Sequence, residues 1–164
     1  MKISGFYDES ISNGLGWRAV LFVSGCPHNC KGCHNPDAQK FECGEKFEKE
    51  KIIKQINSNS ILKGVTISGG EPLCKENIEE VVDFIKEVKT NKKNIWCYTG
   101  YTLEELENRD DSSTKEALKL IDVLVDGKFV EELKNPLLKF KGSENQRIID
   151  LNEYRNQNKI VEVV

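Results

Sequence analysis

The stretch RAVLFVSGCPHNCKGC, residues 18–33, joins an apolar run to a dense group of cysteines. A nearly unbroken apolar run that ends at a glycine is typical of a strand buried on both faces of a parallel sheet. The cysteines begin just past the predicted strand, which is where ligands bind in open α/β sheets. This stretch therefore predicts a strand that carries a reactive loop at its C-terminal end.

Further apolar runs, each followed closely by glycine, predict three more strands, at residues 64–68, 94–98 and 121–126. Apolar residues spaced by three and four predict a helix over 78–88 that buries one face. Phe47, Ile52, Ile53 and Ile56 indicate an earlier helix, and the capping-box pairs Thr102/Glu105 and Ser113/Glu116 predict two later helix starts.

This alternation of strands and helices argues for right-handed βα units around a parallel sheet. The 164 residues are too few for a closed eight-fold βα barrel, which needs about 250. We therefore expect a single α/β domain, built as an incomplete (βα) barrel with a curved parallel sheet. Its core would span residues 1–151, and residues 152–164 would form a polar C-terminal tail that is mobile.

The composition predicts a globular protein of the cytoplasm. Hydrophobic residues make up 38% and charged residues 31% of the chain, no run of 18 apolar residues occurs, and the N-terminus lacks the apolar segment of a secretory signal. The formal net charge is -3, so a broad cationic surface is not indicated. Neither nucleic acid nor a membrane is an expected partner.

Cys26, Cys30 and Cys33 have the spacing C-x3-C-x2-C, which allows one compact loop to turn three thiols toward a single metal centre. Thiolates suit iron–sulfur clusters or zinc, but a closed site normally takes four protein ligands. With three, one iron stays open to substrate. The alternative is a zinc loop completed by His28, His34 or a distant cysteine, although we expect both histidines to face water.

Ser68-Gly69-Gly70-Glu71-Pro72 follows the predicted strand at 64–68. Paired glycines expose backbone groups and let a ligand approach closely, and Glu71 could accept hydrogen bonds from a ligand amine. Alone, this motif is more often an ordinary turn into a helix. In combination with the cysteine loop it becomes specific.

The two motifs together resemble the radical S-adenosylmethionine (SAM) superfamily, in which C-x3-C-x2-C holds a 4Fe–4S cluster and a Gly-Gly-Glu turn helps to bind the methionine part of SAM. Further blocks are similar to the family of anaerobic ribonucleoside-triphosphate reductase-activating proteins, and they span most of the chain: residues 14–18 (GLGWR), 20–36 (VLFVSGCPHNCKGCHNP), 68–73 (SGGEPL), 98–101 (YTGY), 122–127 (DVLVDG) and 142–147 (GSENQR).

The resemblance implies that Cys26, Cys30 and Cys33 hold three irons, while the amine and carboxylate of SAM occupy the fourth. Many relatives carry an aromatic residue just before the third cysteine, whereas this chain has Gly32, which leaves only backbone contacts there. His34 would then lie near the adenosine, and Glu71 and Gly70 would contact the amine. The implied cofactor-binding residues are Gly32, Cys33, His34, Ser68, Gly69, Gly70 and Glu71.

The reaction implied by the family is the reductive cleavage of SAM to methionine and a 5′-deoxyadenosyl radical, which takes a hydrogen atom from a glycine of the anaerobic reductase. The cofactors do the bond breaking, so we assign no acid–base catalytic residue. Cys97 is expected in the core, while Cys43 and Cys74 are too scattered for a second cluster. Electrons would then come from an external low-potential donor such as flavodoxin or ferredoxin.

Two alternative functions remain open from the sequence. One is an activase of another glycyl-radical enzyme, of the formate acetyltransferase type, and the other is a non-enzymatic zinc or electron-transfer module. Asp126-Gly127 is either a SAM contact or a turn, and Lys128 is open between the same two readings. The GSENQR segment is a candidate for the rim that faces SAM or the partner.

Overall fold

Four parallel strands form the centre of a seven-stranded sheet in the computed structural model, which describes residues 1–164. The strand order is β3-β1-β2-β4-β5-β6-β7. The strands are β1 (Lys2–Ser10), β2 (Arg18–Val23), β3 (Glu45–Lys46), β4 (Gly64–Gly69), β5 (Asn94–Tyr98), β6 (Val123–Asp126) and β7 (Arg147–Asp150). The helices are α1 (Lys49–Asn57), α2 (Ile78–Thr90), α3 (Leu103–Glu107), α4 (Ser112–Leu120) and α5 (Leu151–Gln157).

The sheet is mixed, which corrects the expectation of a wholly parallel one. Strands β2, β4, β5 and β6 run parallel as predicted, but β1, β3 and β7 pair antiparallel with their neighbours. Strand β1 escapes sequence analysis because its apolar residues are interrupted by Gly5 and by polar residues, and its pairing with β2 shifts register twice. The predicted α/β class is confirmed.

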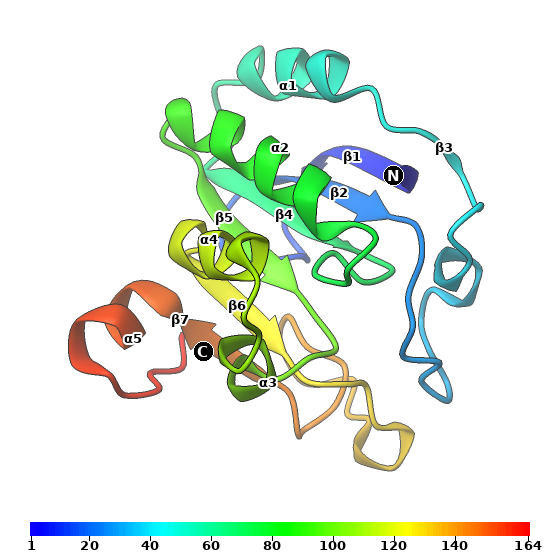
Figure 1. Cartoon of the computed structure of the whole chain (residues 1–164), viewed down its shortest axis with the longest axis vertical. Helices are drawn as coiled ribbons and strands as arrows, with labels where there is room; N and C mark the ends of the chain where they lie inside the picture. The colour runs from blue at the N-terminus through cyan, green and yellow to red at the C-terminus, as the bar shows by residue number, and fades with distance from the viewer.

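The two faces of the sheet are covered differently (Figure 1). Helices α1, α2 and α4 lie side by side over one face, as Figure 1 shows, and the largest apolar cluster forms between them and the sheet. Alternating residues of the parallel strands supply the sheet side of that cluster: Ala19, Leu21, Val23, Val65, Ile67, Ile95, Cys97 and Leu124. The opposite face has no helices over the parallel strands, and loops pack there instead.

Arg18, the first residue of β2, links the N-terminal parts of β2, β4 and β5 on this second face. The residue is 1% exposed, and its guanidinium donates hydrogen bonds to the Thr66 hydroxyl, to the carbonyls of Leu15 and Val65, and to both oxygens of Asn94. The same group lies over the Trp96 ring, 5.5 Å from its centroid. Burial lowers the pKa of Arg18 to about 10.

The helix starts agree only partly with the predicted caps. Thr102 and Glu105 form the expected reciprocal capping box at α3. Helix α4 begins earlier than predicted, because the side chain of Asp111, rather than Ser113, accepts the Thr114 N–H and caps it. Aspartate is a strong cap, so it displaces the start by two residues.

The residues after β7 form a helix and then return along the sheet edge. Helix α5 is capped by Asp150, and Tyr154 packs against the main apolar cluster. Farther on, the Val161 carbonyl accepts the Asp150 N–H at 2.8 Å, and the Val163 N–H donates to Ile148 at 2.8 Å. The polar stretch at 152–158 is therefore mostly helical, while the mobility of residues 152–164 stays a prediction.

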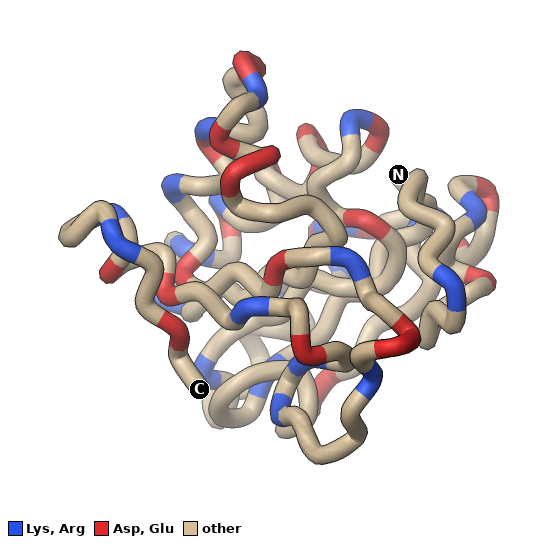
Figure 2. The backbone as a smooth tube through the Cα atoms, turned by 90° about the horizontal axis from the view of Figure 1, so that it is seen from below, with Lys and Arg blue, Asp and Glu red and all other residues tan.

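Figure 2 shows acidic and basic residues interleaved along the whole backbone. No long segment carries charges of one sign only. None of the helices has both the length and the apolar character that crossing a bilayer requires.

Candidate functional site

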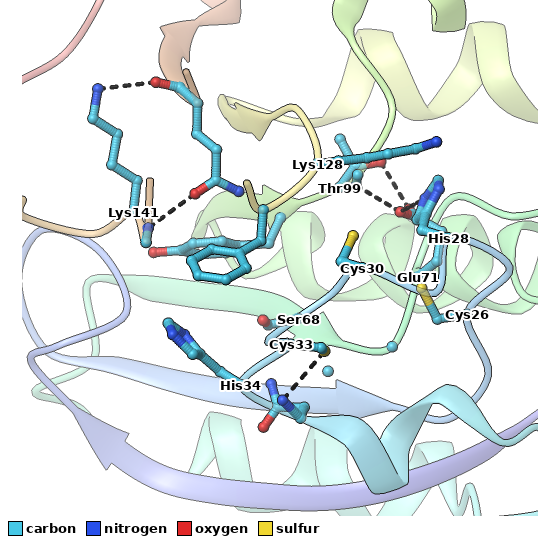
Figure 3. Close-up of a pocket in the computed structure, with 18 of the residues that line it drawn as sticks. Cys26, His28, Cys30, Cys33, His34, Ser68, Glu71, Thr99, Lys128 and Lys141 are labelled. Atoms are coloured by element: carbon cyan, nitrogen blue, oxygen red, sulfur yellow. Dashed lines mark hydrogen bonds and ion pairs between the residues drawn. The ribbon is translucent and has the colours of Figure 1, made fainter. Parts of the chain in front are cut away.

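A cavity of about 540 Å³ opens at the C-terminal ends of the parallel strands, on the face that the helices leave free. Small-molecule sites commonly measure about 300 to 1,000 Å³. Figure 3 shows the loop after β2, the turns after β4 and β5, and the loop after β6 around this space. The structure brings together all but one of the predicted site residues: Cys26, Cys30, Cys33, His34, Ser68, Gly69, Gly70 and Glu71 line the cavity.

The exception is Gly32, which is exposed and does not line the cavity. Its φ is +74°, and an added Cβ would lie 3.1 Å from the Glu131 side chain. A larger residue would be strained at this position, which gives a local reason for glycine before the third cysteine.

The cysteine loop is held at its base by backbone hydrogen bonds. Gly25 and Cys26 donate to the carbonyls of Ala38 and Gln39, at 2.7 and 3.0 Å. Within the loop, the Cys33 N–H donates to the Cys30 carbonyl at 3.2 Å, which closes a turn. The loop therefore presents its three cysteines from one short, closed segment.

The thiols of this loop are free, as are all the other cysteines of the chain. Burial raises the pKa of Cys26 to about 11, although a hydrogen bond from the His28 backbone opposes that shift. The Cys33 sulfur accepts the Asn35 N–H at 3.4 Å. A bound metal would complete deprotonation, because metal binding to cysteine releases protons.

No group of three or more His, Cys, Asp or Glu side chains is arranged to hold one metal ion. In a cubane cluster each thiolate binds a different iron, so the three sulfurs do not have to converge on one point. Three free thiols on one loop that line one cavity fit such a cluster better than a lone zinc ion. Cys26, Cys30 and Cys33 are therefore the residues that could hold a 4Fe–4S cluster.

The glycine turn after β4 lies directly against the cysteine loop. Gly70 donates to the Val23 carbonyl and Glu71 donates to the Gly25 carbonyl, both at 2.7 Å. A Cβ at Gly70 would lie 2.4 Å from the Gly25 carbonyl oxygen, so only glycine permits this approach. The Gly70 carbonyl itself accepts no hydrogen bond from the chain, which leaves an acceptor beside the cavity.

The Glu71 carboxylate, by contrast, is already saturated with donors from the chain. It is 1% exposed. One oxygen accepts the Leu73 N–H at 2.9 Å and the Thr99 hydroxyl at 2.8 Å. The other accepts the Gly100 N–H and lies beside the His28 ring nitrogen, both at 2.7 Å. The contact of Glu71 with a ligand amine stays a prediction, and the geometry favours a bracing role instead.

The two loop histidines differ, although the sequence suggested that both face water. The side chain of His28 is only 6% exposed, because its ring nitrogen bonds to Glu71 and its ring packs edge-on against Tyr101. His34 is exposed, lines the cavity and lies at 4.8 Å from the Phe129 ring. The expectation was therefore wrong for His28, whose partner lies 43 residues away in the sequence.

The far wall of the cavity is the loop after β6. Its Gly127, Lys128 and Phe129 line the space, and so do Gly142 and Gln146 of the GSENQR segment. The Gln146 side chain holds the two parts of the loop together, since it donates to the Gly127 carbonyl and accepts the Gly142 N–H, both at 2.9 Å.

Asp126 does not line the cavity, although its neighbours Gly127 and Lys128 do. Its carboxylate is 1% exposed and binds Arg147 and the Leu103 N–H, so it braces β7 and α3. The Lys128 ammonium makes neither a hydrogen bond nor an ion pair within the chain and remains available to a ligand.

Aromatic residues of the cavity were missed by sequence reasoning. Tyr98, Phe129 and Phe140 line the wall, and Tyr98 carries a phenol whose pKa burial raises. The available signal was position: Tyr98 ends β5 and alternates with the core-facing Cys97, so it had to point to the opposite face.

The cavity at the strand ends is lined by three free thiols, and comparison with known proteins bears on what they hold. Residues 12–149 match the family model described as "4Fe-4S single cluster domain". This match covers most of the chain, including the cysteine loop and the glycine turn. The chain therefore belongs to a class of proteins built around one iron–sulfur cluster.

Curated relatives narrow the class further. The chain is 40% identical over 152 residues, 89% of its length, to a protein of Salmonella typhi, of which it covers 96%. It is 42% identical over 90% of its length to a protein of Vibrio cholerae (97% covered), and 39% identical over 94% to one of Pasteurella multocida (100% covered). All three are named anaerobic ribonucleoside-triphosphate reductase-activating protein, and the chain belongs to that family, as its motifs predicted.

Proposed function

We propose that this chain is an iron–sulfur activating enzyme that uses SAM to generate a glycyl radical on an anaerobic ribonucleoside-triphosphate reductase. The observation that carries the proposal is the meeting of three free thiols and the Gly69-Gly70 turn in one cavity, in a chain of the activating-protein family. Fold alone would not suffice, because one α/β architecture supports many reactions.

In this proposal Cys26, Cys30 and Cys33 hold three irons of the cluster and leave the fourth for the amine and carboxylate of SAM. A cluster held there would supply the one electron for reductive cleavage of SAM to methionine and a 5′-deoxyadenosyl radical, and that radical would take a hydrogen atom from a reductase glycine. The part of the chain is to bind, orient and shield the reactants. No acid–base residue is required.

The surrounding residues supply the groups that SAM needs. The Gly70 carbonyl would accept a hydrogen bond from the amine, because it has no donor within the chain, and Glu71 would support the turn. The ammonium of Lys128 would pair with the carboxylate. His34 and Phe129 offer a ring surface to the adenine, while Gly32, Ser68 and Gly69 remain proposed backbone or hydroxyl contacts.

The sheet serves this chemistry as an incomplete barrel, with residues 1–151 as the core domain and 152–164 as its tail. The aromatic wall of Tyr98, Phe129 and Phe140 would keep water away from a reactive carbon. The reducing electron would come from an external low-potential donor such as flavodoxin or ferredoxin. Cys43, Cys74 and Cys97 do not lie at the cavity, so they offer no second cluster in this path.

The test begins with oxygen-free protein reconstituted with iron and sulfide. We expect a brown protein that converts SAM to 5′-deoxyadenosine when reduced, and that gives a glycyl-radical EPR signal when mixed with the anaerobic reductase. Omission of SAM is the control. A colourless protein with stoichiometric zinc that ignores SAM would support the zinc module and refute the proposal.

The partner is tested by the same EPR measurement with two acceptors. A signal on the anaerobic reductase, and none on a formate acetyltransferase, is the expected result. A signal on the lyase alone would keep the SAM chemistry and overturn the choice of partner.

A further inference from the structure

We infer that His28 is a positioning residue, whose hydrogen bond to Glu71 fixes the cysteine loop against the glycine turn. The catalytic role of His28 rests on the proposed function, because the cysteine loop would carry the cluster and the Gly69-Gly70 turn would contact SAM. The structural content of the inference is independent of that function. A loop that carries a cluster must keep its thiols at a fixed place relative to the substrate, and backbone contacts at the base alone leave its tip free to move.

His28 lies midway between Cys26 and Cys30, so a contact that fixes its side chain also restrains the backbone that carries both cysteines. Its ring nitrogen lies 2.7 Å from a carboxylate oxygen of Glu71, and the side chains of the pair are 6% and 1% exposed. A hydrogen bond to a buried carboxylate is among the stronger ones in proteins. Figure 3 shows this contact beside Cys26 and Cys30.

Glu71 makes the anchor rigid because it receives three donors without His28. Leu73 binds it from its own turn, whereas Thr99 and Gly100 bind it from the turn after β5. Its carboxylate therefore joins the turns after β4 and β5, and His28 adds the cysteine loop to this junction. Three loops that the sequence keeps far apart meet at one side chain.

Packing holds the imidazole ring in a slot of matching shape. The ring lies edge-on to Tyr101 with centroids 4.5 Å apart. A Cβ at Gly100 would lie 2.5 Å from the His28 ring, so the slot exists only because residue 100 is glycine. Behind it, the Arg109 guanidinium lies 4.1 Å from the Tyr101 ring centroid and donates to the Leu73 carbonyl.

The test compares three substitutions in anaerobically reconstituted protein. His28→Ala removes the ring and the hydrogen bond, and His28→Gln keeps a side-chain N–H that can reach Glu71. Lys31→Ala is the matched control, because Lys31 lies on the same loop, does not line the cavity, and makes only a solvent-exposed ion pair, 3.6 Å from Glu131, with its own side chain 83% exposed. Each protein is examined by hydrogen–deuterium exchange of residues 26–35 and by EPR of the reduced cluster with and without SAM.

We expect His28→Ala to speed amide exchange in residues 26–35 and to weaken the change that SAM makes in the EPR spectrum. Its KM for SAM should rise about tenfold, with a smaller effect on kcat, and His28→Gln should recover most of this loss. Lys31→Ala should behave as wild type. If exchange and EPR of His28→Ala match wild type, or if His28→Gln is as impaired as His28→Ala, the inference is wrong.

The failure of the inference can be told apart from failure of the proposed function. A wild-type protein that binds no cluster or ignores SAM would refute the proposed function, while the exchange rates of residues 26–35 would still decide whether His28 holds the loop. Should His28→Ala fail to fold, His28→Phe takes its place, because it keeps a ring in the slot but cannot bond to Glu71. Faster exchange of residues 26–35 in His28→Phe than in His28→Gln is then the expected result, and equal exchange in the two variants would overturn the positioning role.

Discussion

The two faces of the central sheet use the same strands for different purposes. On the helix-covered face, side chains such as Ile67, Ile95 and Leu124 are completely buried and purely apolar. On the other face the alternate positions include Thr66, Ser68 and Tyr98, and the cavity opens above them. One face therefore supplies most of the apolar burial that stabilises the fold, and the other exposes polar groups to a ligand. Each of the following substitutions tests that division.

The largest effect is expected on the cavity side. Cys30→Ala should abolish SAM cleavage and remove most of the bound iron, because two thiols cannot hold the cluster against its substrate. Iron content and 5′-deoxyadenosine formation measure this, and the urea midpoint of the metal-free variant should stay close to that of the metal-free wild type. Near-normal turnover would contradict the ligand assignment.

The Arg18 network, at the N-terminal ends of the strands on the open face, should instead contribute to stability. Arg18→Met is expected to cost about 3 kcal/mol of unfolding free energy, since it leaves several buried acceptors without a donor. Urea denaturation of the metal-free chain measures the change, with the exposed Lys63→Met as control. A loss under about 0.5 kcal/mol would show that this network contributes little to stability.

Lys128→Met should affect binding without affecting the fold. Loss of one charge-assisted hydrogen bond to the SAM carboxylate should raise KM about tenfold and leave kcat nearly unchanged. Lys139→Met, an exposed lysine of the same loop outside the cavity, is the control. An unchanged KM would remove Lys128 from the site.

The smallest effect is expected from a cysteine on the apolar face. Cys97 is fully buried in the main cluster, and burial raises its pKa well above the ordinary value, so it behaves as a small apolar side chain. Cys97→Ala should cost about 1 kcal/mol of stability and leave the iron content intact. Loss of the cluster in this variant would show that Cys97 takes part in cluster binding, and that the apolar face is not purely structural.

The sequence predicted the apolar face far better than the open one. The four parallel strands follow from continuous apolar runs, and α2 follows from apolar residues spaced by three and four, because burial leaves an apolar pattern in the sequence. Strand β7 was not predicted because it has only four residues. Helix α5 was predicted as a tail because six of its seven residues are polar or aromatic. Short elements that depend on tertiary contacts leave little local signal.

The cysteine loop and the glycine turn that line the cavity could be predicted from the sequence, but the contacts that hold them in place could not. The cysteine spacing and the Gly-Gly-Glu turn are local, so their residues could be identified from the sequence. The environment of His28 depends on Glu71, Gly100 and Tyr101, which lie 43 or more positions away. The saturation of Glu71 has the same origin, because two of its donors follow another strand.

The backbone hydrogen bonds of Val161 and Val163 beside β7 also affect how copies of the protein meet. An exposed sheet edge can recruit a strand from another molecule and so begin aggregation. Here one edge is shielded by the chain itself, and the other ends in β3, which has only two residues. The edge at β7 therefore offers no free strand, whereas β3 pairs only with Lys2 and Ile3 and leaves the rest of β1 open, so contacts between crowded copies should fall at β1, on the opposite edge of the sheet from β7.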